Sequence, residues 1–242
     1  MRVGNASSDV AKPFPRISVV IPVLDEEARI VQQLDALRAL QGIHEIIVVD
    51  GDSSDRTLEL ARSHAGVIVV SAKRGRAVQM NAGARVATGD VILFLHADVR
   101  LPRDAARWVA AALAESGVVA GAFRTWTVAD GRRTWLGPLL HLADLRSRYA
   151  GVPYGDQALF VRAGVFRRLG GFPDQPLMED VELGRRLRRV GEIRTVPASV
   201  LVSGRRFVAR PLYYTFLVNA FPLLYRLGVP PRRLASLYGN AR

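Results

Sequence analysis

A histidine and an aspartate stand two positions apart, directly after an apolar run, in the stretch ILFLHADVRLP from Ile92 to Pro102. Side chains at positions i and i+2 of an extended chain point to the same face, so His96 and Asp98 are expected to reach one object together. An imidazole and a carboxylate suit a divalent cation, Mn²⁺ or Mg²⁺, whose remaining ligands are substrate phosphates. A purely structural histidine is the alternative for His96.

Two further groups of acidic residues have spacings that suit binding or catalysis. In VVDGDSSDRT, Asp50 and Asp52 follow an apolar run, where a carboxylate can accept from a base N–H or a ribose hydroxyl; Asp55 is expected to cap the next helix. In PLMEDVELGRRLRRVG, Glu179 and Asp180 open a predicted helix. They are either partners of the helix terminus or, for Asp180, a general base that deprotonates an acceptor hydroxyl.

Arginines stand beside glycines at two places in the chain. Arg76 follows Gly75, where the backbone can approach a ligand and a guanidinium can pair with phosphate, although no Walker or dinucleotide motif is present. Arg205 and Arg206 follow Ser203 and Gly204 at the end of a predicted short strand, and they either bind a diphosphate or lie on the solvated surface.

Apolar strands alternate with amphipathic helices in the first hundred residues. Strands are predicted over 17–23, 45–50, 66–71 and 91–96, and helices over 27–40, 55–64 and 75–87. This alternation predicts an α/β fold with a mostly parallel central sheet and helices on both faces. Ligands of such sheets bind beyond the carboxyl ends of the strands, which is where the polar residues described above gather.

The second half of the chain is less regular. A helix over 103–115, a strand over 118–128, a helix near 132–149, a turn and strand over 154–162 and a helix within 176–191 are predicted. We divide the chain into a loose tail (1–16), a catalytic domain (17–210, with halves 17–101 and 102–210) and a helical appendage (211–242).

Composition narrows the partners and the compartment. The 34 lysines and arginines exceed the 22 acidic residues by 12, which favours an anionic partner or reflects genomic bias; no motif for nucleic-acid binding accompanies this charge. Cysteine is absent, which is consistent with a reducing, cytoplasmic compartment. The uncharged run PLYYTFLVNAFPLLY has 15 residues, fewer than the roughly 20 of a membrane-spanning helix, and predicts a buried helix with a face toward a membrane or partner.

In this order, the motifs resemble the family 2 glycosyltransferases of the GT-A fold. The resemblance rests on VVIPVLDEE, VVDGDSSDRT, NAGARVATGD, FLHAD and MEDVELGRRLRRVG, between Ile17 and Gly191. The combination of RGRAVQMNAGA, LFLHAD, GDQALFVR and GGFPDQPLMEDVEL is similar to one bacterial subgroup, labelled arsenosugar-biosynthesis glycosyltransferases. Some relatives carry a carotenoid-acid glucosyltransferase label instead.

The resemblance implies sugar transfer with inversion, from a nucleotide-diphosphate donor, most simply a UDP-sugar, to a hydroxyl or carboxyl group of a small molecule, lipid or carotenoid-type acceptor. The implied donor-binding residues are Pro22, Glu26, Asp50, Asp52, Arg76, Asp98, Arg205 and Arg206. The implied acceptor residues are Gly155, Asp156 and Gln157. Asp180, with Glu179 beside it, would be the catalytic base, and Asp98 with His96 would hold the metal.

Two positions depart from the family pattern. His96 stands where the family usually has aspartate, which removes one negative charge; we expect either weaker binding of the ion or a shift in preference from Mg²⁺ toward Mn²⁺. Gly51 stands where a second aspartate is common, so Asp52 is expected to make the ribose contact instead.

Three alternatives remain at this point. A nucleotidyltransferase would carry a glycine-rich loop after the first strand, whereas PVLDEEAR contains no glycine. A nucleotide-binding module that has lost catalysis would not need the Glu179–Asp180 pair. A peripheral contact of 211–225 with anionic lipid at the inner face of the cell membrane concerns only where the enzyme works. The oligomeric state is left open.

Overall fold

The computed structural model describes residues 14–128, 144, 152–205 and 211–238. The helix predicted near 132–149 lies outside the described residues apart from Asp144, and so do Arg206 and most of the predicted tail.

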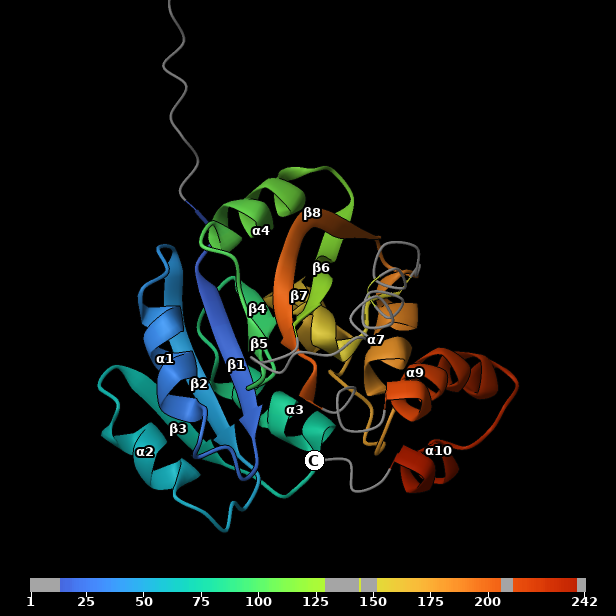
Figure 1. The fold of residues 1–242 in the computed structure, drawn as a ribbon. Helices are drawn as coiled ribbons and strands as arrows, with labels where there is room; N and C mark the ends of the chain where they lie inside the picture. The colour runs from blue at the N-terminus through green and yellow to red at the C-terminus, as the bar shows by residue number, and fades with distance from the viewer. Residues whose placement is uncertain (1–13, 129–143, 145–151, 206–210, 239–242) are drawn as a thin grey trace, which may run out of the picture.

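The described strands form one sheet of eight, in the order β3-β2-β1-β4-β7-β6-β8-β5 (Figure 1). The four strands of its first half are parallel and match the predicted ones: β1 (Ile17–Val23), β2 (Ile43–Asp50), β3 (Val67–Ser71) and β4 (Val91–Phe94). The predicted α/β fold with a mostly parallel sheet is therefore confirmed.

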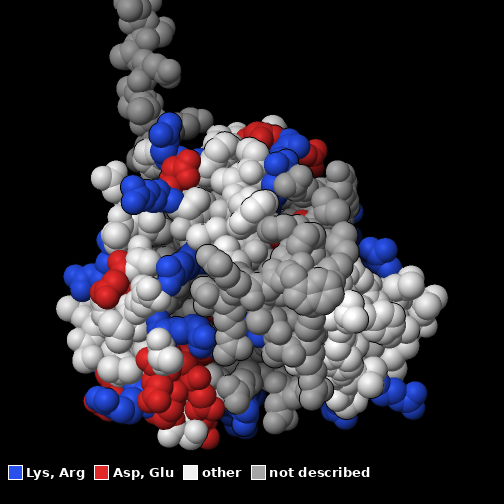
Figure 2. Space-filling model, viewed as in Figure 1, with Lys and Arg blue, Asp and Glu red and all other residues white. Residues whose placement is uncertain are grey.

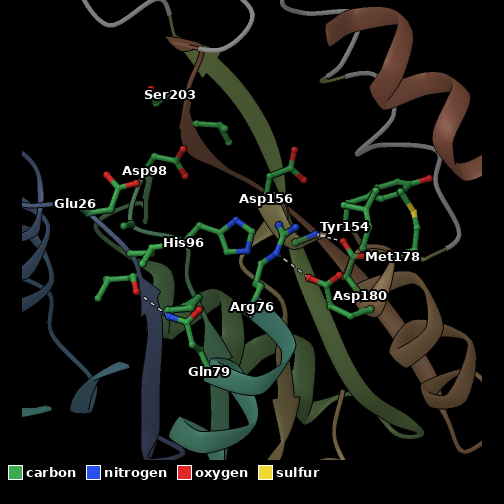
Figure 3. A pocket seen from close by; sticks show the side chains of 18 of the residues that line it. Glu26, Arg76, Gln79, His96, Asp98, Tyr154, Asp156, Met178, Asp180 and Ser203 are labelled. Carbon is green, nitrogen blue, oxygen red and sulfur yellow. Dashed lines mark hydrogen bonds and ion pairs between the residues drawn. The ribbon is translucent and has the colours of Figure 1, made fainter. Parts of the chain in front are cut away.

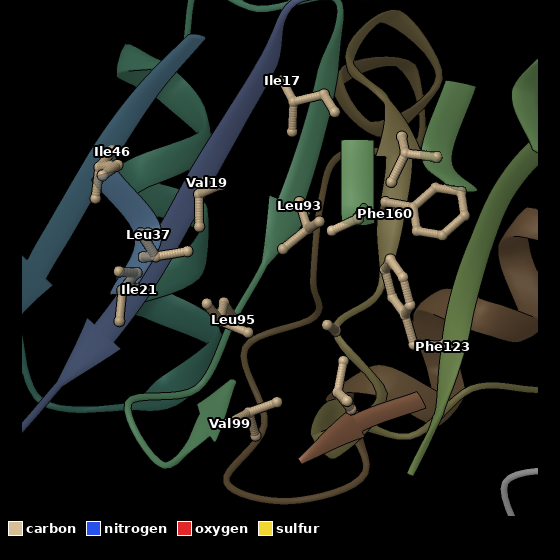
Figure 4. Close-up of a cluster of buried hydrophobic side chains, with 14 of the residues drawn as sticks. Ile17, Val19, Ile21, Leu37, Ile46, Leu93, Leu95, Val99, Phe123 and Phe160 are labelled. Atoms are coloured by element: carbon tan, nitrogen blue, oxygen red, sulfur yellow. The ribbon is translucent and has the colours of Figure 1, made fainter. Parts of the chain in front are cut away.

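Helices cover both faces of this half of the sheet. The connecting helices are α1 (Ile30–Arg38), α2 (Thr57–Ser63) and α3 (Arg76–Val86). Side chains of β1 alternate between the faces, so Val19 and Ile21 pack in the cluster that contains Leu34 of α1, and Val20 packs with Met80 of α3. Figure 4 shows the first of these clusters, in which Val19 and Ile21 of β1 lie near Leu37 of α1. Burial on two faces explains why these strands consist mainly of apolar residues.

The second half of the sheet contains antiparallel pairs. Its elements are β5 (Val99–Arg100), α4 (Ala105–Ala114), β6 (Val118–Val128), the 3₁₀ turn η1 (Gly155–Gln157), β7 (Phe160–Arg162), α6 (Ala163–Arg168), α7 (Glu179–Leu187) and β8 (Glu192–Ser203). Strand β7 runs antiparallel to both β4 and β6, which joins the two halves of the sheet.

The long strand β8 was not predicted beyond a short strand before Ser203. It pairs along most of its length with β6, and the register shifts where Ala122 opposes Thr195 but Arg124 opposes Ser199. Pro197 lies in this irregular stretch, and a proline within a sheet is confined to edges or bulges. The proline interrupts the pattern by which a strand is predicted from sequence, but the sheet accommodates the proline at this irregularity.

Two C-terminal helices, α9 (Pro211–Arg226) and α10 (Pro231–Tyr238), pack against the loop before α7. Leu217, Phe221 and Leu234 join Leu177 and Met178 in a small separate core. The helix predicted over 211–225 is thus buried on one side only. Within the described residues, every helix is too short or too polar to cross a bilayer.

Candidate active site

A pocket opens beyond the carboxyl ends of β1 and β4, as the sheet topology predicts. Ten of the residues predicted from sequence line it: Pro22, Glu26, Arg76, His96, Asp98, Gly155, Asp156, Glu179, Asp180 and Arg205. Figure 3 shows Glu26 and Asp98 on one side, Tyr154, Met178 and Asp180 on the other, and His96 and Arg76 between them. Segments separated by as many as 179 positions therefore meet at one site, as in the contact of Arg205 with Glu26.

The loops after β1 and β2 lie on the predicted donor side of the site, and their carboxylates are held by local donors. Asp50 accepts hydrogen bonds from the backbone N–H groups of Asp52 and Ser53, both at 3.2 Å, and from the Ser53 hydroxyl. Asp25 accepts from the backbone N–H of Ser54 at 2.8 Å. Asp25 and Asp52 both adopt positive φ angles, of 52° and 70°. These bonds lock the two loops together.

Asp55 belongs to the same network and has the structural role that the sequence favoured. Its carboxylate accepts from the backbone N–H of Thr57, the first residue of α2, and from the backbone N–H of Glu27. Burial raises the pKa of Asp55, but the bonds from the Thr57 hydroxyl and from these N–H groups outweigh burial and hold the pKa below its usual range. Arg56, which directly precedes the helix, makes no side-chain cap.

Three predicted residues do not line the pocket. Asp50 is 2% exposed and directed into its own loop, and Asp52 lies outside the pocket on the same loop. Gln157 is 1% exposed, and its amide bonds the carbonyl of Phe123 and the N–H of Tyr154. Gln157 therefore shapes the loop that carries Gly155 without facing the cavity.

His96 and Asp98 both face the pocket, but the reason differs from the one expected. Strand β4 ends at Phe94, and Asp98 lies in a turn, so the two side chains do not share one extended segment. The turn that leads into β5 brings them to the same cavity. Asp98 is 3.4 Å from Nη2 of Arg205, and the same nitrogen is 2.8 Å from Glu26. One guanidinium therefore joins two predicted donor-site carboxylates.

The acceptor-side wall contains the Glu179–Asp180 pair at the start of α7. Oδ2 of Asp180 accepts from the backbone N–H of Gly155 at 2.5 Å, and Oδ1 accepts from the N–H of Val181 at 2.7 Å. Glu179 is 2% exposed and pairs with Nε of Arg76 at 2.8 Å. Its Oε2 has no hydrogen-bond partner among the described residues. Two adjacent carboxylates thus share a site that has few donors.

This environment changes the protonation of Asp180. Burial and, next, the neighbouring charge of Glu179 together raise the pKa of Asp180 to about 6, against the opposing effects of Arg76 and of the two backbone N–H groups. A carboxyl group whose pKa lies near neutrality, inside a pocket, is typical of an acid–base catalyst.

Gly155 lies where His96 and Asp180 converge. A Cβ atom at this position would lie 2.9 Å from Cε1 of His96 and 3.4 Å from Oδ2 of Asp180. The absence of a side chain therefore allows the candidate base, the candidate metal ligand and the loop to share one corner of the pocket.

Several lining residues were not predicted as site residues. Gln79 donates from Nε2 to the carbonyls of Val23 and Val49, which ties the ends of β1 and β2 together beside Arg76. Tyr154 and Met178 each directly precede a predicted site residue, so their position in the sequence was a usable signal. Phe221, from α9, had no such signal.

The fold is that of GT-A glycosyltransferases. A mannosyltransferase from Pyrobaculum calidifontis, solved with GDP-Man and Mn²⁺, superposes with a TM-score of 0.66 at 22% identity, over 94% of this chain and 69% of that one. Glucosyl-3-phosphoglycerate synthase from Mycobacterium tuberculosis, solved with Mn²⁺, UDP and glucosyl-3-phosphoglycerate, gives 0.60 at 24% identity, over 89% and 81%.

Residues 18–170 match the sequence model of Glycosyl transferase family 2, and the chain belongs to this family. It is 30% identical over 217 residues to the probable glycosyltransferase YdaM of Bacillus subtilis, which covers 78% of this chain but 50% of YdaM. It is 31% identical over 245 residues to undecaprenyl-phosphate 4-deoxy-4-formamido-L-arabinose transferase of Pseudomonas paraeruginosa, over 95% of this chain and 70% of that protein. The chain thus spans between half and about two thirds of the length of these relatives.

Proposed function

We propose that the protein transfers a sugar, with inversion at the anomeric carbon, from a nucleotide-diphosphate donor to an acceptor hydroxyl, with Asp180 as general base. The observation that carries this proposal is the placement of Asp180 in the pocket, with its pKa raised to about 6. At neutral pH such a carboxylate is ionised and still basic enough to take a proton as the acceptor attacks.

The groups around Asp180 are proposed to have different roles in positioning the base, the diphosphate and the acceptor. The Gly155 N–H fixes Oδ2, which leaves the remaining lone pairs of the carboxylate to face the acceptor. Glu179 holds Arg76 at 2.8 Å, and Arg76 is proposed to lie against the departing diphosphate, where charge develops. Asp156, on the same loop as Gly155, is proposed to border the acceptor.

The donor is proposed to lie along the opposite wall. Pro22 and Glu26 line the pocket at the end of β1, and the loop that carries Asp50 and Asp52 closes this side. A UDP-sugar is the proposed donor; solved proteins of this fold hold either GDP-Man or UDP. The assignment to the arsenosugar subgroup remains a proposal that rests on the motif resemblance.

The residues present suit a divalent metal shared with the diphosphate. The described residues contain no group of three or more His, Cys, Asp or Glu side chains placed to hold an ion. Asp98 and His96 offer two ligands on the pocket wall, which leaves the other positions to phosphate oxygens and water. A bound ion would neutralise charge on the leaving group, and a nitrogen ligand favours Mn²⁺ over Mg²⁺.

Arg205 is proposed to serve two partners in turn. Without ligands it neutralises Glu26 and Asp98, at 2.8 and 3.4 Å. Asp98 would hold the metal and Glu26 the donor, which would free the guanidinium to bind the diphosphate in bidentate fashion. The enzyme is proposed to work in the cytoplasm, at the inner face of the membrane.

The decisive experiment replaces the proposed base. Asp180→Asn should lower kcat by a factor on the order of 10²–10⁴, because the amide cannot accept the acceptor proton. Calorimetric affinity for UDP should remain, since the amide keeps the size of the side chain. Asp174→Asn, an exposed change on the same loop, is the matched control and should behave as wild type. Near-normal turnover of Asp180→Asn would eliminate the assignment.

Metal removal tests the second part. Treatment with EDTA should abolish transfer, and Mn²⁺ should restore it. Asp98→Asn should weaken Mn²⁺ binding in the presence of UDP by tenfold or more, measured by calorimetry, since it removes a carboxylate ligand. Full activity in EDTA would leave His96 and Asp98 with a structural role only.

A further inference from the structure

Helix α9 is apolar on its exposed side as well as on its buried side. Leu212, Phe216 and Leu223 are 71%, 68% and 59% exposed, and Leu227, directly after the helix, is 74% exposed. Their spacings of four, seven and four residues place them on one stripe of the helix, named here the α9 stripe.

The opposite side of the helix is already covered. Leu217 and Phe221 are buried against Leu177 and Met178, in the small core below the helix. No charged residue occurs from Pro211 to Tyr225. Asn219 is an exposed polar residue on the same side, and its amide donates to the carbonyl of Thr215. A helix whose exposed side is otherwise so apolar is typical of contact with a membrane or another protein.

The charge around the stripe is of one sign. Residues 193–242 contain eight arginines and no aspartate or glutamate. Arg226 ends α9, and Arg232 and Arg233 lie on α10, all three exposed. Figure 2 shows the surface over these two helices, at the right, as white with blue at its edge and without red on the face seen. An apolar stripe on a pair of helices that carry arginines and no carboxylate is complementary to an anionic, partly apolar surface.

We propose that the α9 stripe docks on an anionic lipid bilayer, with Arg226, Arg232 and Arg233 against the lipid headgroups. The helix has 16 residues and is therefore about 24 Å long, short of the roughly 30 Å of a hydrocarbon core, so it lies in the interface and does not cross it. A second copy of the chain is a poorer occupant, because a two-fold contact would bring the same arginines onto one another without any carboxylate to pair them.

Docking in this way would place the active site beside the lipid. Phe221 lines the pocket from the inner side of α9, and the α9 stripe lies on the outer side of the same helix. A helix with its side chains is about 10 Å thick, so the pocket wall would lie roughly one helix diameter from the bilayer. The docking itself does not depend on the transfer reaction proposed above.

The test is co-sedimentation of the full chain with vesicles of equal parts phosphatidylglycerol and phosphatidylcholine, and with phosphatidylcholine alone. Strong binding is expected only to the anionic vesicles, and about 1 M NaCl should weaken it, since the Debye length falls to about 3 Å. Phe216→Gln, Leu223→Gln and Leu227→Gln together should reduce binding on the order of 10²-fold. Replacing Arg226, Arg232 and Arg233 by glutamine should cost about fivefold for each arginine.

The control combines Ile68→Gln, Val86→Gln and Val190→Gln, three exposed apolar residues outside α9 and α10, and should bind as wild type. Asp180→Asn should also bind as wild type, which separates docking from catalysis. Three outcomes would overturn the inference: wild type that ignores both vesicles, a triple glutamine variant of the stripe that binds undiminished, or a dimer that this variant dissociates in the absence of lipid.

Discussion

The carboxylates on the two sides of the pocket differ in their hydrogen bonding and in their neighbouring charges. On the proposed donor side, Asp50 and Asp55 do not themselves line the pocket, and each accepts several hydrogen bonds from backbone N–H groups and hydroxyls of the loops after β1 and β2. On the acceptor side, Glu179 and Asp180 adjoin each other, and Oε2 of Glu179 has no hydrogen-bond partner within the described residues. The carboxylates of the first side are held by hydrogen bonds alone, whereas on the second side Asp180 accepts two N–H bonds but also lies beside the charge of Glu179.

This difference indicates which wall carries out the chemistry. Carboxylates that receive several N–H donors become weak bases, as the lowered pKa of Asp55 illustrates, and serve to hold a loop in place. A carboxylate that is partly desolvated next to another acid becomes a stronger base, as the raised pKa of Asp180 illustrates. This contrast supports the proposal that the donor side serves binding and the acceptor side proton transfer.

A larger side chain at Gly155, on the proposed acceptor side, should have the largest effect on kcat. Gly155→Ala places a methyl group 2.9 Å from His96 and 3.4 Å from Asp180, so we expect kcat to fall about 10²-fold through misplacement of the base, with the fold retained. Gly164→Ala, in α6, meets only Arg168 at 3.9 Å and should keep full activity. Steady-state kinetics and melting temperatures of both variants would decide the point. An active Gly155→Ala enzyme would contradict the close approach.

Removing one carboxylate from each wall should affect stability unequally. Asp55→Ala leaves the N–H groups of Glu27 and Thr57 without their acceptor and should cost about 2 kcal/mol of unfolding free energy. Glu179→Gln keeps an oxygen for Arg76, and the loss of this ion pair is offset by relief of the repulsion between Glu179 and Asp180, so its cost should stay below about 1 kcal/mol. Urea denaturation measures both values. Equal costs would erase the contrast between the walls.

The pH dependence gives a smaller but more specific effect. Because the base must be ionised, kcat should fall about tenfold per pH unit below pH 6, the value to which the pKa of Asp180 is raised. Glu179→Gln removes a charge that raises this pKa, so the acid limb of the kcat profile should move to lower pH. An unmoved limb would show that Glu179 does not act on Asp180.

Stability should respond to the same ionisation. The pKa of Asp180 is higher in the folded protein than its ordinary value of 3.8, so the folded state binds this proton more tightly. Its contribution to stability is full below pH 3.8 and is lost as the pH rises through about 6. Asp180→Asn should remove this part of the stability profile, which can be followed by thermal unfolding at several pH values.

The sequence determined the first half of the sheet and much of the site. Strands that are buried on both faces, such as Ile17–Val23, consist mainly of apolar residues and can be predicted from that pattern. The acidic site residues follow within a few positions of the strand end, so they can be predicted as well. Glu179 and Asp180 were placed at a helix start by equally local signals. Such features depend on periodicity and turn chemistry, which short stretches of sequence contain.

Only the tertiary structure decided which of these residues share the cavity. Asp50 turned inward to its loop and Gln157 toward Phe123, whereas Phe221 reached the pocket from a helix that follows Asp180 by some forty residues. The sequence also did not predict the contact of Arg205 with Glu26 and Asp98, or the continuation of β8 across Pro197. These outcomes depend on packing and ion pairing between distant segments, and no local pattern records which distant partner a side chain will meet.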